Sequence, residues 1–122
     1  GCGRGGPKTY PIHGKLELVG NDVAHLAGNH IEAALAGDLT KRASGVIRAD
    51  GTFKLETLHA GSTITGATAG AYLVRIVLSD DDAAARPQAT QAIASRYLSF
   101  QTSGLSLEVP SAGPINLQAA AR

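Results

Sequence analysis

The sequence has few of the residues on which many specialised binding sites depend. Among 122 residues there is one cysteine, there is no tryptophan or methionine, and aromatic residues make up 4%. A single cysteine cannot form an intramolecular disulfide framework or a cysteine-rich zinc site. So few aromatic rings argue against a stacking platform for bases or sugars.

An excess of charge of one sign is also lacking. The 11 Lys and Arg residues nearly balance the 10 Asp and Glu residues, which leaves a formal net charge of +1. Nucleic-acid-binding domains usually carry a basic excess, so we expect no nucleic-acid partner. The sequence contains no apolar run long enough to span a bilayer. Hydrophobic residues make up 43% and charged residues 17%, which is sufficient for one packed domain.

The first residues lead to an expectation about processing. A chain without Met does not begin at its own start codon, so we expect that an N-terminal segment has been removed. Gly1-Cys2 resembles the junction at which a bacterial lipoprotein signal peptide ends, and the Gly-rich stretch after it suits a flexible tether. We therefore expect residues 1–9 to be a leader with lipid on Cys2, which places the protein at the membrane of the bacterial cell envelope. The alternative is a tag remnant followed by an ordinary thiol.

Alternating apolar residues, separated by turn residues, dominate the rest of the chain. Gly, Asn and Asp recur in short clusters, and these residues favour turns. Between the clusters, apolar side chains occupy every second position, which is typical of antiparallel strands with one face on a core. The strands predicted from this pattern are 10–19, 29–36, 42–49, 52–58, 70–79, 104–110 and 114–119.

These runs predict that residues 10–122 form one all-β domain, a seven-stranded antiparallel β-sandwich of the immunoglobulin-like kind. The predicted core consists of the inward-facing members of the alternating runs. They are Ile12, Leu16, Leu18, Ile31, Leu35, Phe53, Leu55, Tyr72, Val74, Ile76, Leu105, Leu107, Val109, Ile115 and Leu117.

Three local signals add detail to this fold. Asp50-Gly51 lies between two β-prone runs and predicts a hairpin. Tyr72 opens the longest apolar stripe after Gly70 and resembles the corner tyrosine of immunoglobulin-like sandwiches, whose hydroxyl bonds a nearby backbone group. The stretch 80–100 breaks the alternation, and we expect a long connection between the two sheets, with short helical turns after Asp80-Asp81-Asp82 and within 90–97.

Five segments carry a resemblance that extends over residues 10–118. They are Ile12-His13-Gly14-Lys15-Leu16, Leu26-Ala27-Gly28-Asn29-His30-Ile31, the run 43–53 with Asp50-Gly51-Thr52-Phe53, Gly70-Ala71-Tyr72-Leu73-Val74, and the run 93–109 with Thr102-Ser103-Gly104-Leu105. In this order they resemble the motifs of carboxypeptidase regulatory-like domains, and the last resembles the ending of a group of small bacterial lipoproteins. Ala69 and Ala94 stand where those motifs have Pro.

The resemblance implies a prealbumin-like seven-stranded sandwich that is not catalytic. It also implies that the motif residues have structural roles, namely Gly14, Asp50, Gly51, Gly70, Tyr72 and Gly104. We expect a structural or interaction role in the cell envelope, with no cofactor, because folding explains every strong motif and no convergent set of side chains is left over for chemistry. The membrane contact would be the lipid on Cys2, and the partner would be an envelope protein or polysaccharide.

The remaining candidates for chemistry are histidines and an acidic run. We expect His13 and His30 to face outward on strands that could be neighbours, and His25 and His59 to lie in turns. A surface metal site is the alternative to solvated histidines. The run Asp80-Asp81-Asp82 lacks the interleaved spacing of a dedicated calcium loop, so we expect a solvated acidic turn, with calcium as the alternative.

Two enzyme families built on related sandwiches are the alternatives to a non-catalytic module. Transthyretin-related hydrolases end in a Tyr-Arg-Gly-Ser motif, whereas this sequence ends Gln118-Ala119-Ala120-Ala121-Arg122. Intradiol dioxygenases use two Tyr and two His around iron, and Tyr10, Tyr72 and Tyr97 are spread without such a pattern. We therefore expect no catalytic residues and no metal site.

Overall fold

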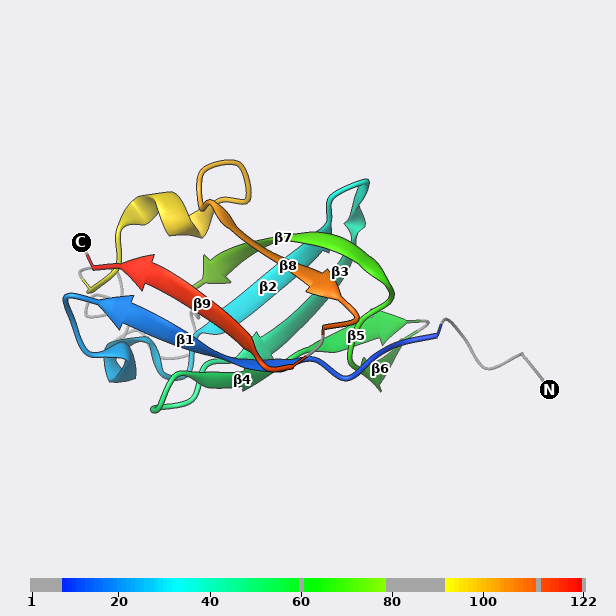
Figure 1. Ribbon diagram of the computed structural model, residues 1–122, viewed down its shortest axis with the longest axis horizontal. Helices are drawn as coiled ribbons and strands as arrows, with labels where there is room; N and C mark the ends of the chain where they lie inside the picture. The colour runs from blue at the N-terminus through cyan, green and yellow to red at the C-terminus, as the bar shows by residue number, and fades with distance from the viewer. Residues whose placement is uncertain (1–7, 60, 79–91, 112, 122) are drawn as a thin grey trace.

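The computed structural model describes residues 8–59, 61–78, 92–111 and 113–121, and within them it is an all-β fold of two sheets (Figure 1). The strands are β1 His13–Val19, β2 His30–Leu35, β3 Asp38–Val46, β4 Thr52–Lys54, β5 Glu56–His59, β6 Ser62–Thr65, β7 Gly70–Val77, β8 Leu105–Val109 and β9 Ile115–Ala120. Two short 3₁₀ helices, η1 Val23–Leu26 and η2 Ser95–Leu98, lie between strands. The predicted all-β sandwich is therefore confirmed.

The two sheets differ in size. The smaller has the order β4-β1-β9 and the larger has the order β6-β5-β3-β2-β7-β8. All neighbouring strands are antiparallel except β1 and β9, which run parallel from the pair Gly14 and Ile115 to the pair Val19 and Ala120. The predicted count of seven strands is too low, and the purely antiparallel arrangement is wrong for β1 and β9.

Two features account for the extra strands. The predicted run 52–58 is divided into β4 and β5 because the chain leaves the small sheet and enters the large one at Leu55. The strand β6 was not predicted because Ser62-Thr63-Ile64-Thr65 has a single apolar side chain, so it shows no alternation, and it follows the turn residue Gly61.

The predicted core is almost entirely correct. All fifteen residues are buried except Leu35 and Ile115, which are half-buried and pack against the cluster. The core also contains large side chains that the alternating pattern did not include, namely Leu26, Ile47, Ile93 and Tyr97. They lie in or beside irregular segments and 3₁₀ helices, where a period of two residues does not apply.

The long connection differs from the prediction. It joins β7 and β8, which pair with each other in the large sheet, so it does not cross between sheets. In its described part, η2 overlaps the predicted helical stretch 90–97 and ends one residue beyond it. This helix places the Tyr97 hydroxyl 3.0 Å from the backbone nitrogen of Ala120, at the end of β9. The helical turn predicted after Asp80-Asp81-Asp82 lies outside the described residues.

Candidate functional site

The strand that passes from one sheet to the other organises the candidate site. Along Thr52 to Leu58 the side chains alternate, so Phe53 and Leu55 are 1% exposed while Lys54 and Glu56 are exposed. At the crossing point, the Leu55 backbone nitrogen donates to the Ile12 carbonyl (3.0 Å), and its carbonyl accepts from the Gly66 nitrogen (2.9 Å). The crossing is therefore anchored on both sides by backbone hydrogen bonds.

A glycine lets the crossing strand lie against β3. A Cβ atom at Gly45 would be 1.9 Å from the Lys54 carbonyl oxygen, a distance that no side chain can occupy. Beyond Ser44, which pairs with Glu56, β3 and β5 separate because the chain turns away into β4. The outward-facing side chains of both sheets meet at this point.

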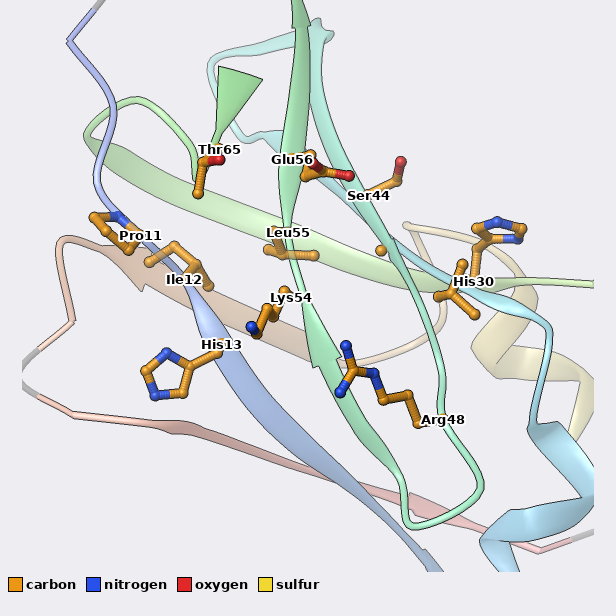
Figure 2. Close-up of a pocket in the computed structure, with 12 residues that line it drawn as sticks. Pro11, Ile12, His13, His30, Ser44, Arg48, Lys54, Leu55, Glu56 and Thr65 are labelled. Carbon is orange, nitrogen blue, oxygen red and sulfur yellow. The ribbon is translucent and has the colours of Figure 1, made fainter. Parts of the chain in front are cut away.

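These side chains line an open cleft of about 660 Å³, which is within the size range of small-ligand sites. It lies around the crossing strand, with residues of β1 and the segment before it on one side and residues of β2 and β3 on the other (Figure 2). Its apolar lining comes from Pro11, Ile12, Val46 and Leu55, and its polar lining from His13, His30, Ser44, Arg48, Lys54, Glu56 and Thr65.

Basic groups gather at one end of the cleft. His13 and Lys54 are directly opposed across β1 and β4, so both side chains leave the same face of the small sheet. Figure 2 shows His13 and Lys54 on one side of the crossing strand and Arg48 on the other, all three below Leu55 in the view, with Glu56, Ser44 and Thr65 above Leu55. Neither Arg48 nor Lys54 forms an ion pair with another described residue.

A second charged cluster has a different character. On the outer face of the large sheet, Glu32 accepts from Arg75 at 2.6 Å and from Arg42 at 3.3 Å. Both guanidinium groups also stack over the buried Phe100 ring, with centroid distances of 4.6 Å for Arg75 and 5.3 Å for Arg42. Because these arginines already have a carboxylate and an aromatic partner, their role is to hold the segment around Phe100 on the sheet.

The histidine predictions are partly wrong. His13 and His30 do not lie on paired strands, because β1 and β2 belong to different sheets, yet both line the cleft. His25 lies in η1, and His59 ends β5 instead of lying in a turn. In the part of the chain that the structure describes, no three His, Cys, Asp or Glu residues lie close enough together to hold a metal ion.

Of the motif residues expected to be structural, Asp50 and Gly51 form the tight turn after β3. The Asp50 carboxylate accepts from the Thr52 hydroxyl (2.6 Å) and the Thr52 backbone nitrogen (3.0 Å), and these bonds hold the pKa of Asp50 below its usual value. Gly51 has a φ of 88°, which favours glycine. The predicted hairpin is present, because the Arg48 nitrogen donates to the Thr52 carbonyl (2.9 Å) at its tip and β3 pairs antiparallel with β5. The strand that returns from the turn first pairs with β1 of the small sheet, as β4, before it joins the large sheet as β5.

The other motif residues lie at strand contacts. A Cβ atom at Gly14 would be 2.3 Å from the Ile115 carbonyl oxygen, so glycine permits the close pairing of β1 and β9. The Tyr72 hydroxyl donates to the Thr68 carbonyl at 2.8 Å, which is a bond of the kind predicted for a corner tyrosine. Gly70 begins β7 and Gly104 immediately precedes β8.

Sequence reasoning did not identify the cleft residues Ser44, Arg48, Lys54, Glu56 and Thr65. Alternation along 52–58 places Lys54 and Glu56 outward, but it does not reveal that these two residues belong to different sheets. The candidates Cys2 and Asp80-Asp81-Asp82 lie outside the described residues.

Comparisons of the chain with models of protein families, with curated proteins and with solved structures found no match. Among the described residues, no helix has the length and apolar character needed to cross a membrane.

Proposed function

We propose that this chain is a non-catalytic interaction module of the bacterial cell envelope, tethered to the membrane by lipid on Cys2. In this proposal the sandwich of residues 10–122 is related to the immunoglobulin- and prealbumin-like carboxypeptidase regulatory-like domains that its motifs resemble. The cleft around the crossing strand is the surface that binds an envelope component.

The observation that carries the proposal is the construction of the cleft. Its polar side chains extend from β1, β2, β3, β4, β5 and β6, whose backbones are paired, and from the turn after β3. A site on such a rigid framework loses little conformational entropy when it binds. Ser44, Thr65 and Glu56 supply hydrogen-bonding groups, while Arg48 and Lys54 supply charge.

The roles of the motif residues also support a non-catalytic module. Gly14 permits the contact between β1 and β9, Asp50 and Gly51 shape a turn, and Tyr72 ties the chain at Thr68. Each of these residues therefore has a role in folding, which agrees with the structural roles that the resemblance implies.

The test of the tether is membrane fractionation of the protein produced from its native gene with the upstream sequence. We expect the wild-type protein to sediment with membranes and to enter the detergent phase on Triton X-114 extraction, since an acyl chain adds a large apolar surface. Cys2→Ser should appear in the aqueous phase, and Cys2→Ala should behave in the same way. Equal partition of the wild-type and variant proteins would contradict the tether.

A further inference from the structure

The charges of the cleft indicate which chemical class it binds. The cleft contains two permanent cations, Arg48 and Lys54, and one carboxylate, Glu56. His13 lies opposite Lys54 on the same face, and Arg48 lies across the crossing strand from them at the same end of the cleft (Figure 2). In a protein whose formal net charge is only +1, this is a local concentration of positive groups.

The cations are available to a ligand. The other arginines of the large sheet, Arg42 and Arg75, share the Glu32 carboxylate, whereas no described carboxylate pairs with Arg48 or Lys54. Both residues are exposed, so a ligand can reach them from solvent. Because neither is paired with a described carboxylate, the ligand would not have to displace an existing ion pair. An arginine fork and a lysine ammonium together suit oxyanions, which accept charge-assisted hydrogen bonds from both.

The rest of the cleft indicates that the ligand is larger than a single oxyanion. The cleft measures about 660 Å³, and beyond its basic end the lining includes, besides Glu56 and His30, small hydroxyl side chains and aliphatic groups, Ser44, Thr65, Pro11 and Val46. Hydroxyl groups pair with neutral donors and acceptors, and among the described residues no Phe, Tyr or Trp ring lines the cleft.

We propose that this cleft binds a ligand of oligomer size that carries oxyanions, either carboxylates or phosphates, with Arg48 and Lys54 as the charge partners. The inference rests on the proposed interaction role and specifies the ligand of that same site. Glu56 limits binding by repelling the anion. Ser44 and Thr65 contact the uncharged part of the ligand.

The test is a titration of the unlipidated Cys2→Ser chain in which binding is monitored through the amide chemical shifts in NMR spectra. The probes are inorganic tripolyphosphate for phosphate, trigalacturonate for carboxylate and maltotriose as the neutral control. We expect saturable shifts at His13, Arg48 and Lys54 with one or both anions and none with maltotriose. Shifts with tripolyphosphate alone would identify phosphate as the ligand group, and shifts with trigalacturonate alone would identify carboxylate.

Charge variants make the test specific to the cleft. The double variant Arg48→Gln with Lys54→Gln should weaken anion binding by about fivefold or more. The matched control is Arg96→Gln with Lys41→Gln, which removes one Arg and one Lys outside the cleft and should change the affinity by less than about twofold. Glu56→Gln should strengthen binding by about twofold, because it removes a repulsive charge.

Several outcomes would overturn the proposal. These are the absence of shifts with both anions, shifts centred away from the cleft, or equal loss of affinity in the cleft variant and the matched control. An unchanged amide spectrum away from the substituted residues establishes that the variants remain folded. The result is separable from the membrane tether, because the titrated chain carries Cys2→Ser.

Discussion

Replacing Gly45 by Ala tests whether the crossing strand lies against β3 as described. The added Cβ would be 1.9 Å from the Lys54 carbonyl oxygen and 2.8 Å from its carbon, whereas ordinary contacts begin near 3.4 Å. The obstacle is backbone and not a flexible side chain. The crossing strand must therefore retreat by about 1 Å or more, although it is anchored to Ile12 and Gly66 at Leu55.

We expect this substitution to lower the free energy of unfolding by about 3 kcal/mol, the upper part of the range for overpacked sites. For a domain of this size that corresponds to a fall in melting temperature of about 10 °C. The assay is thermal and urea unfolding followed by circular dichroism. The matched control is Gly37→Ala, whose Cβ would meet nothing within 4 Å and which should be neutral or slightly stabilising. A difference below about 0.5 kcal/mol between the two variants would refute the close contact.

Two further predictions concern hydrogen bonds. Tyr72→Phe should destabilise the fold by about 1–2 kcal/mol, because the Thr68 carbonyl loses its hydrogen-bond partner. Urea unfolding measures this difference, with Tyr10→Phe as the control variant. Equal unfolding midpoints for the two variants would contradict the prediction. The pKa of Asp50 is lowered, chiefly by the Thr52 hydroxyl, so its contribution to stability is present above the ordinary aspartate pKa and is lost as pH falls through the lowered value. Asp50→Asn should therefore flatten the acid side of the stability profile, and an unaltered profile would count against this.

Periodicity predicts most of the strands and nearly all of the core. Tyr72, Val74 and Ile76 alternate with half-exposed residues, and only one face of such a strand can be buried. The same pattern cannot identify the sheet to which a strand belongs. Phe53 and Leu55 alternate without interruption, yet the first lies in β4 of the small sheet and the second lies at the crossing to the large one.

The candidate site was less predictable because it depends on contacts between distant segments. The alternating pattern predicts that His13 and His30 face outward, but their common position in the cleft follows from the turn at Asp50-Gly51 and the crossing at Leu55. The importance of Gly45 depends on a carbonyl nine residues away. Neither propensity nor spacing encodes such a contact, since it is determined by tertiary packing.

Binding through the basic cleft is tested by co-sedimentation of the Cys2→Ser chain with purified cell-wall sacculi that retain their anionic polymers. Because this chain carries no lipid, sedimentation reports the interaction of the sandwich alone. We predict that it sediments with the sacculi, that salt releases it, and that Arg48→Gln with Lys54→Gln leaves it in the supernatant, while Arg96→Gln with Lys41→Gln sediments normally. Sedimentation of the cleft variant at the level of the matched control would contradict the claim that this protein binds an envelope component through its basic cleft.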